Sequence, residues 1–269
     1  MFTGSDDFFD LFEAGAAWDE AAGHIKVFKL YGGWTPDFVS DRQLRRAVED
    51  IRRRGMALAV EAGPLAVGDC GAGMESFAGP DEARGFVEQL QRIGATVDFV
   101  AFDEPLYFAK LADGPAACHW DAARIAREIV EYVTVVRTAY PAARFGDIEP
   151  LIAPLDADDI DEWLVAYEQA VGEPLAFIHM DIDFARPGWQ EVALAIEAVG
   201  DRKGVETGLI YTGPREAATD LEWIQNAGER VKEYEVMGGG KPDHVVFQSW
   251  VDHPDRVLPE TDPTTFTGF

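Results

Sequence analysis

Apolar residues along this chain follow two alternating patterns. Short runs of β-branched and aromatic residues predict buried strands, and apolar residues spaced three and four apart between these runs predict helices. The predicted strands span residues 25–31, 57–61, 97–104, 144–149, 175–183, 204–212 and 244–250. The predicted helices span residues 40–54, 81–93, 120–138, 158–170, 188–199 and 219–237. Residues 1–24 are acidic and aromatic, and we expect helix and loop there.

Strands that alternate with helices at this spacing are typical of parallel sheets with helical crossovers. We therefore expect an α/β fold, a (β/α)8 TIM barrel, formed by residues 1–269 as a single domain. Such a barrel needs about 250 residues and eight strands, so we expect its N-terminal strand to be irregular or missing. A doubly wound open sheet is the competing architecture, but residues 31–36 lack the G-x-G-x-x-G turn that usually follows its first strand.

One predicted strand ends abruptly in charge. The run Val97-Asp-Phe-Val-Ala-Phe-Asp-Glu-Pro-Leu106 is mostly apolar until Asp103 and Glu104, which Pro105 follows. Because proline cannot donate to a central ladder, the strand is expected to stop near this residue. Ligands bind at the carboxyl ends of the strands in barrels and open sheets of parallel strands. The sequence therefore predicts that Asp103 and Glu104 lie at a binding site.

The ends of the other predicted strands carry polar and aromatic residues as well. Together with Asp103 and Glu104, the candidate site residues are Glu61, Asp147, Glu149, His179, Asp181, Tyr211, Gln248 and Trp250. Because side chains alternate along a strand, Asp147 and Glu149 are expected to face the same way. For the same reason, Asp103 and Glu104 cannot both point into the lumen along a regular strand.

Acidic residues at four consecutive strand ends indicate a particular chemistry. Carboxylates that lie close together repel, which raises one pKa and lets a neutral acid stand beside an ionised neighbour. Glycoside hydrolysis needs this arrangement, a proton donor and a nucleophile or base on either side of one bond. Aromatic side chains near the strand ends are suited to stack on sugar faces, with ordinary packing as the alternative for each. They are Trp34, Tyr107, Tyr211 and Trp250.

Short motifs at the strand ends carry a family resemblance. Phe102-Asp-Glu-Pro105 resembles the Asn-Glu-Pro strand end of the large retaining glycosidase clan built on (β/α)8 barrels, with Asp103 in place of the clan's Asn. Trp250 is similar to the tryptophan that ends the last strand in that clan. Across the chain, the DEP, GDIEP and QSW segments resemble those of bacterial glycoside-hydrolase-like barrel proteins. The resemblance implies a carbohydrate substrate and gives Glu104 the role of general acid/base.

The chain departs from the clan at the second catalytic residue. The clan's nucleophile is a Glu at the end of the penultimate strand, and here that strand ends Ile210-Tyr-Thr-Gly213 without an acid. The partner of Glu104 must then be Glu61, Glu149 or Asp181. We favour Glu149, because its Asp-Ile-Glu-Pro context repeats the pattern of a strand end followed by proline.

The hypothesis that follows is an enzyme, a glycoside hydrolase that cleaves glycosidic bonds with Glu104 and Glu149 at the C-terminal mouth of the barrel. No cofactor and no metal are expected for this activity. The expected substrate-binding residues are Glu61, Asp103, Asp147, His179, Asp181, Tyr211, Gln248 and Trp250.

Two other functional classes stay open. In a metal-dependent sugar isomerase or epimerase, Glu104, His179 and Asp181, with Asp147 or Glu149, would hold Mg²⁺ or Mn²⁺, which favour oxygen-rich ligands. The missing acid on the penultimate strand also fits a non-catalytic carbohydrate-binding barrel. Metal analysis distinguishes a metal-dependent isomerase or epimerase from a hydrolase. Detectable cleavage of any glycan rules out a non-catalytic carbohydrate-binding barrel.

The net charge restricts the kinds of molecule that the protein is expected to bind. The 269 residues carry a net charge of −26 with a pI near 4.4, and such a surface repels nucleic acids and anionic membranes. The acidic candidate site likewise favours a neutral or cationic glycan over a polyanion. No run approaches the roughly 18 apolar residues of a membrane-spanning helix.

The two cysteines, Cys70 and Cys118, have no C-x-x-C spacing, so no zinc ribbon or thioredoxin-type motif is expected. Each lies in a loop after a predicted strand, so they are either bridged, if the protein is exported, or two free thiols. No basic region followed by an apolar stretch begins the chain. Localisation is therefore left open between secreted, if a signal peptide was removed, and cytoplasmic, and the oligomeric state is open as well.

Overall fold

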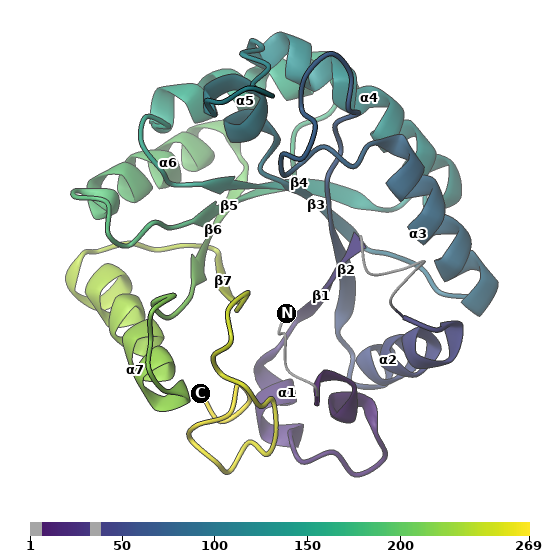
Figure 1. The fold of residues 1–269 in the computed structure, drawn as a ribbon, viewed down its shortest axis with the longest axis vertical. Coiled ribbons are helices and arrows are strands. Elements are labelled where there is room, and N and C mark those ends of the chain that lie inside the picture. The colour runs from purple at the N-terminus through teal and green to yellow at the C-terminus, as the bar shows by residue number, and fades with distance from the viewer. Residues whose placement is uncertain (1–6, 33–38) are drawn as a thin grey trace.

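The computed structural model describes residues 7–32 and 39–269, so the candidate aromatic Trp34 lies outside the described residues. Seven parallel strands form one sheet in which each strand pairs with the next along the chain. Figure 1 shows this sheet curled around a central axis. The strands are β1 (Val27–Tyr31), β2 (Ala57–Ala62), β3 (Phe99–Asp103), β4 (Arg144–Pro150), β5 (Phe177–Asp181), β6 (Glu206–Tyr211) and β7 (His244–Phe247).

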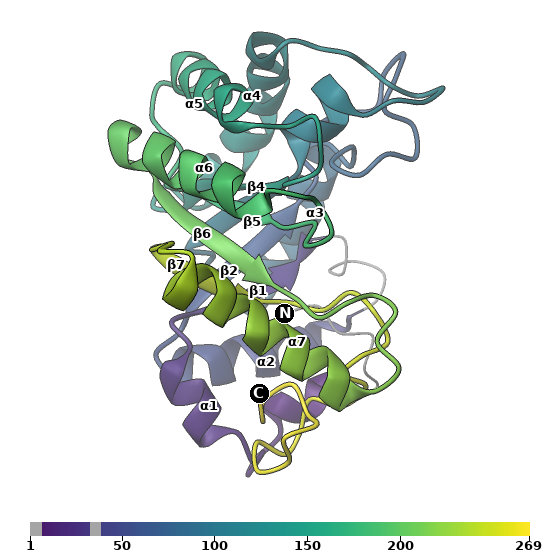
Figure 2. The same cartoon turned by 90° about the vertical axis from the view of Figure 1, so that its left-hand side faces the viewer.

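Helices follow the strands and cover the outer face of the sheet (Figure 2). Two π-helical segments, η3 (Tyr107–Leu111) and η4 (Lys232–Met237), lie between the longer elements. The long helices are α2 (Asp41–Arg53), α3 (Pro80–Ile93), α4 (Ala122–Ala139), α5 (Ala157–Val171), α6 (Trp189–Lys203) and α7 (Asp220–Val231). The predicted alternation of parallel strands and helices is thereby confirmed.

Local side-chain chemistry sets the helix boundaries. The Ser40 hydroxyl accepts the Gln43 backbone N–H at 3.3 Å, and the Gln43 side chain accepts the Ser40 backbone N–H at 3.2 Å, which starts α2. Asp156 and Asp159 form the same reciprocal box at the start of α5. Gly94, with a φ of 73°, ends α3 in the left-handed conformation that glycine adopts without steric cost.

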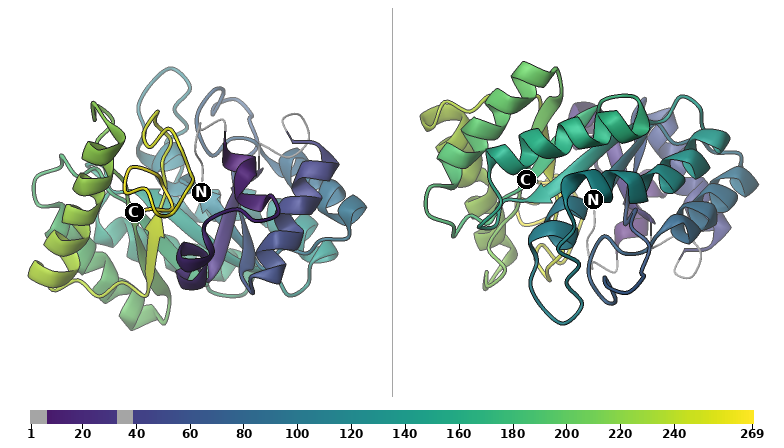
Figure 3. Two further views of the ribbon diagram at one scale, coloured as in Figure 1. Left: turned by 90° about the horizontal axis from the view of Figure 1, so that it is seen from below. Right: turned by 90° about the horizontal axis from the view of Figure 1, so that it is seen from above.

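The sheet is open between β1 and β7. The N-terminal helices η1 (Phe8–Phe12) and α1 (Asp19–His24) and the C-terminal segment 251–269 lie side by side at this opening (Figures 1 and 3). The Glu260 N–H donates to the Ala17 carbonyl at 3.0 Å, and the Val257 N–H donates to the Asp7 carboxylate at 3.0 Å. The fold is thus a curled (β/α) half-barrel, and a complete eight-strand barrel is not seen in residues 7–32 and 39–269.

Two apolar layers flank the sheet. On its outer face, Phe102 packs against Phe145, Tyr132 and Tyr167 in the layer beneath the helices. Inside the curl, a smaller cluster forms the floor below the strand ends. Its buried members are Ala101, Ile148, Phe177 and Ile210. The floor closes the lower part of the lumen and leaves the carboxyl ends of the strands as the accessible face.

Within the described residues, none of the helices combines the length and the apolar character needed to cross a membrane.

Candidate active site

A cavity of about 730 Å³ lies at the carboxyl ends of the strands. Six of the ten predicted site residues line it, namely Glu61, Asp103, Glu104, Asp181, Gln248 and Trp250. The wall also contains residues outside this predicted set of ten. Among these are Tyr31, Glu75, Phe108, Asp183, Phe184, Arg215 and Arg230. The predicted convergence of strand-end acids on one mouth therefore holds for β2, β3 and β5.

Asp103 and Glu104 both line the cavity, although they are consecutive in the chain. Strand β3 ends at Asp103, and Glu104 has a φ of 59°, in the left-handed region that non-glycine residues seldom occupy. This single dihedral breaks the alternation of the strand and turns the second side chain inward. A strained backbone of this kind costs about 1–3 kcal/mol, and such residues cluster at functional sites.

A lysine lies among these acids. Lys29, on β1, forms an ion pair with Glu61, on β2, and the Gln248 side-chain amide lies 3.5 Å from the same carboxylate. Burial lowers the Lys29 pKa to about 8, while the negative charges of Asp103 and other carboxylates act in the opposite direction. The cluster thus includes an internal cation.

The carboxyl groups of the cavity differ strongly in acidity. Burial raises the pKa of Glu104 to about 10, and the charges of Asp181 and Asp103 together with a hydrogen bond to Glu75 add to the rise. Burial also raises the Asp181 pKa to about 7, with Lys29 lowering it. At neutral pH, Glu104 is therefore a neutral acid, whereas Asp181 is close to its titration midpoint.

Asp103 is the most acidic of the three strand-end carboxyl groups on β3 and β5. Burial and the charge of Glu75 raise its pKa to about 6, while Lys29 and a hydrogen bond from the Tyr31 hydroxyl lower it. Asp103 is therefore mostly ionised at neutral pH. The cavity consequently holds both protonated and ionised carboxyl groups within one small volume.

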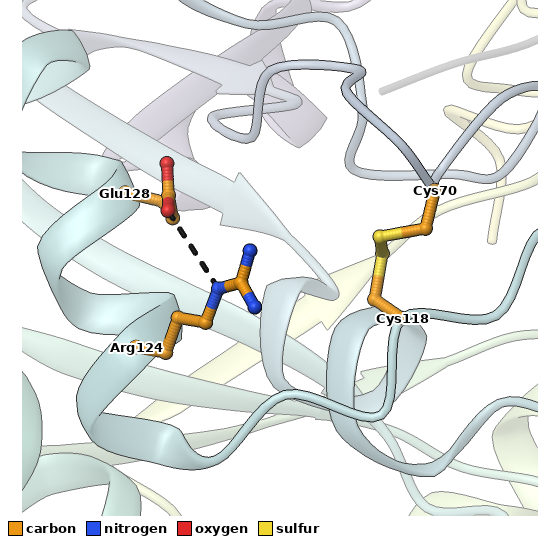
Figure 4. The surroundings of a disulfide bond; sticks show 4 residues. All are labelled: Cys70, Cys118, Arg124 and Glu128. Carbon is orange, nitrogen blue, oxygen red and sulfur yellow. Dashed lines mark ion pairs between the residues drawn. A yellow bond between two sulfur atoms is a disulfide. The ribbon is translucent and has the colours of Figure 1, made fainter.

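Glu75 reaches the site from a loop, which is why no strand-end pattern indicated it. It lies in the segment 68–79, after β2, and a disulfide between Cys70 and Cys118 ties this segment to the loop after η3 (Figure 4). The Gly71 N–H adds a hydrogen bond to the Ala116 carbonyl at 2.8 Å. Of the two possibilities for the cysteines, the structure has the bridge.

The side of the cavity between β6 and α7 is lined by Arg215, Glu216 and Arg230. Arg230 donates to the Thr212 carbonyl, and its guanidinium lies 4.0 Å from the centre of the Phe184 ring. These arginines come from the loop and helix after β6, so the pattern of residues at the strand ends could not predict them.

The structure does not bring Asp147 and Glu149 to the cavity. They share a side of β4, as predicted from the alternation, but this side faces the helices. The Trp163 indole donates to Asp147 at 2.6 Å, and the backbone N–H groups of Leu106 and Tyr107 donate to Glu149 at 2.7 and 2.9 Å. Ile148 and Pro150, on the opposite side of the strand, line the cavity instead.

The environment of Glu149 does not suit a nucleophile. Its side chain is 1% exposed, and burial and the charge of Asp147 raise its pKa well above the ordinary value. A buried carboxyl group of this kind, with no access to the cavity, positions the chain after Pro105 rather than meeting a substrate.

His179 and Tyr211 also lie away from the cavity wall. His179 points into the lumen but below the site, where its ring stacks on Phe177 at 4.3 Å and its Nε2 lies 3.0 Å from the His244 Nδ1. Tyr211 faces outward from β6, and its hydroxyl donates to Glu235 at 2.9 Å. Both residues are held by protein partners rather than presented to a ligand.

The ligand set considered for a metal-dependent isomerase is not assembled. Glu104 and Asp181 share the cavity, but Asp147, Glu149 and His179 lie elsewhere. In the part of the chain that the structure describes, no three His, Cys, Asp or Glu side chains are grouped so that they could hold a metal ion.

Comparisons with known proteins place the fold. No protein family model matches the chain, and no curated protein matches it. A glucosidase from Croceicoccus marinus is similar, with a TM-score of 0.55 and 14% identity over 91% of this chain and 56% of the glucosidase. A fungal β-1,4-galactanase is similar with a TM-score of 0.53 and 12% identity, over 85% of this chain and 78% of the galactanase.

An HpcH/HpaI aldolase from Desulfitobacterium hafniense DCB-2 also matches, with a TM-score of 0.43 and 13% identity over 90% of this chain and 81% of the aldolase. The chain spans little more than half the length of the glucosidase. At these identities, the likeness establishes a (β/α)-barrel type of fold that glycoside hydrolases share, and it establishes the fold alone.

Proposed function

We propose that this protein is a glycoside hydrolase in which Glu104 is the general acid/base and Asp181 is the nucleophile or base. One observation carries the proposal. Glu104, after β3, and Asp181, at the end of β5, line the same cavity, and after burial the charge of Asp181 is the strongest influence on the Glu104 pKa. Two carboxyl groups with unequal acidity on one cavity are what glycosidic cleavage requires.

Glu104 supplies the proton. Its carboxyl group stays neutral at pH 7, since its pKa is raised to about 10. A neutral acid can protonate the glycosidic oxygen as the bond to the anomeric carbon breaks, so that the departing sugar leaves as an alcohol. The left-handed backbone at this residue directs the acid into the cavity before any substrate arrives.

Asp181 supplies the negative charge on the other side of the bond. Lys29 lowers its pKa and so favours the ionised form. The carboxylate then attacks the anomeric carbon or activates a water that does so. Glu61 is the other acid that the sequence offered within the cavity, but it is held in the ion pair with Lys29, so we assign it to maintaining that cation.

Binding surfaces for sugar rings are available on the same cavity. Phe108, Phe184 and Trp250 line it, and aromatic faces stack on the apolar faces of sugars. The fold likeness to a glucosidase and a galactanase supports the same chemistry, because their barrels also serve hydrolysis of sugar linkages. The cavity volume of about 730 Å³ suits a small number of sugar units.

The test compares wild type with Glu104→Gln, Asp181→Asn and the control Glu168→Gln, which removes a carboxylate on the exposed face of α5. Each protein is assayed on natural oligosaccharides and on aryl glycosides with good leaving groups. Loss of a general acid should lower turnover of oligosaccharides by about 10²–10⁴-fold. The loss should be much smaller for dinitrophenyl glycosides, whose leaving group needs no proton.

Asp181→Asn should abolish turnover of both kinds of substrate, because the attacking group is needed whatever the leaving group. The control should match wild type. If Glu104→Gln or Asp181→Asn turned over the substrates at the wild-type rate, that residue would have no part in the mechanism. If wild type hydrolysed none of the substrates, the result would count against the proposed activity itself.

A further inference from the structure

The side of the cavity formed by β1 to β5 consists mainly of hydrogen-bond acceptors. Six carboxyl groups line it there, from Glu61, Glu75, Asp103, Glu104, Asp181 and Asp183. The arginines of the cavity wall stand apart, on the β6–α7 side, where Arg230 is engaged with Thr212 and Phe184. A ligand bound between the acids therefore meets an environment that favours positive charge and groups that donate hydrogen bonds.

Gln248 provides an independent indication of what this side of the cavity binds. The residue is 6% exposed and lines the cavity, and its side-chain Oε1 is buried without a hydrogen-bond partner. Its Nε2 faces the Glu61 carboxylate at 3.5 Å, which fixes the amide orientation, because a carboxylate accepts and does not donate. The free group is therefore an acceptor, and a buried acceptor without a donor is costly unless a ligand supplies one.

We propose that the sugar unit bound on this side of the cavity carries a free, protonated amino group, which donates to the Gln248 Oε1 and to the carboxylates of Asp103 and Asp181. An ammonium group has three donors and no acceptor, so it matches a set made of two carboxylates and an amide oxygen. An N-acetylated sugar would bring a carbonyl oxygen and no charge to the same place. A neutral hydroxyl offers one donor and adds no positive charge to that which Lys29 already brings to these carboxylates.

This inference deepens the proposed function and rests on it for the sugar, but binding tests it without catalysis. Calorimetry compares a glucosamine tetramer and a galactosamine tetramer with their N-acetylated forms and with unsubstituted tetramers of glucose and galactose. Wild type and Glu104→Gln are both measured, so that turnover does not obscure binding. At least one amino tetramer should bind about tenfold or more tightly than its N-acetylated form, because hydrogen bonds to charged groups exceed neutral ones by about that factor.

Two variants test whether Gln248 and Asp103 recognise the amino group. Gln248→Met removes the acceptor, and Asp103→Asn removes one charge, and each should reduce the preference for the amino tetramer several-fold. Glu168→Gln, the surface control, should leave the preference unchanged. Circular dichroism and thermal melting confirm that each variant is folded, and comparing two variants at separate positions protects the test if one of them fails to fold.

The outcomes separate the two proposals. Equal or tighter binding of the N-acetylated or unsubstituted tetramers, or no binding of either amino tetramer, overturns the inference. Cleavage of a neutral or N-acetylated glycan with no preference for amines sinks the inference and leaves the hydrolase intact. Selective binding of an amino tetramer without cleavage of any glycan sustains the inference and counts against the hydrolase.

Discussion

Asp103 and Glu104 are adjacent in sequence, yet both side chains line one cavity, because the backbone at Glu104 has a φ of 59°. A regular strand would send one of them inward and the other toward the helices. The surrounding chain holds the unusual conformation. The Glu104 N–H donates to the Ile148 carbonyl at 3.0 Å, and Pro105 begins the turn that leads into η3.

Replacing Glu104 with Gln should make the folded protein more stable at alkaline pH. The unfolded chain releases this proton near pH 4.5, whereas the folded protein holds it to about 10. Between these values the folded state binds the extra proton, so raising the pH lowers the free energy of unfolding of wild type. Glutamine has no proton to lose, and Glu104→Gln should therefore be more stable than wild type by about 1–3 kcal/mol at pH 8.

Urea unfolding of both proteins at pH 5 and pH 8 measures this difference. The gain should be smaller at pH 5, because the free energy of unfolding of wild type falls progressively above pH 4.5 and little of that fall has occurred by pH 5. Glu168→Gln should show no such dependence. Equal stability of Glu104→Gln and wild type at both values of pH would mean that the acid is not held in its neutral form.

Hydrophobic periodicity was sufficient to predict the strands and helices, since each long element spans three turns or more of one apolar stripe or one buried run. The ends of β2, β3 and β5 also met as predicted, because parallel strands must bring their carboxyl ends to one face. The gap beside β1 is different. Its filling by η1, α1 and the C-terminal segment depends on contacts such as Asp7 with Val257, which no local pattern encodes.

The errors in the predicted site arose from side-chain direction. Asp147 and Glu149 were placed correctly on one face of β4, but alternation alone does not say which face looks inward. The inward face here belongs to Gly146, Ile148 and Pro150, since a Cβ at Gly146 would lie 2.3 Å from the Phe177 ring inside the curl. Glu75 escaped prediction for a further reason, because a disulfide and loop contacts place it rather than a strand.

Glu149→Gln should weaken folding as well as catalysis. The Glu149 carboxyl group accepts two backbone N–H groups, from Leu106 and Tyr107, and an amide offers only one acceptor oxygen. One buried donor is then left unpaired, so the free energy of unfolding should fall by about 1–3 kcal/mol. Turnover should fall with it, because these bonds hold the turn beside Glu104.

Added azide distinguishes this positioning role from a role as nucleophile. A small anion can replace a missing nucleophile where the side chain has been removed, but it cannot restore a displaced turn, so azide should not rescue Glu149→Gly. A variant with wild-type stability, no turnover and recovery in azide would reinstate Glu149 as the nucleophile.

Removing the disulfide should lower both stability and turnover. The bond closes a loop between residues 48 apart in sequence, so the double variant Cys70→Ser/Cys118→Ser should lose about 2–4 kcal/mol of unfolding free energy. Turnover should fall because Glu75, which hydrogen-bonds Glu104, lies on the tethered segment. Dithiothreitol should bring wild type to the level of the variant and leave the variant unchanged. Full stability and turnover of reduced wild type would contradict this expectation.

The last prediction concerns the cation beneath the carboxyl groups. Burial raises the pKa of Asp181 to about 7, and the positive charge of Lys29 acts in the opposite direction. If Asp181 acts as an anion, kcat/KM should rise through about pH 7 as this group ionises. Lys29→Met should move this rising limb of the pH–rate profile to higher pH by roughly one unit. Lys29→Arg keeps the charge and should keep the limb in place, while Lys241→Met, at an exposed position after η4, controls for the loss of a lysine. Lys29→Met also leaves Glu61 without its ion-pair partner, so melting curves are recorded together with the pH–rate profiles. If turnover fell but the rise of kcat/KM stayed at the same pH, Lys29 would contribute to folding alone.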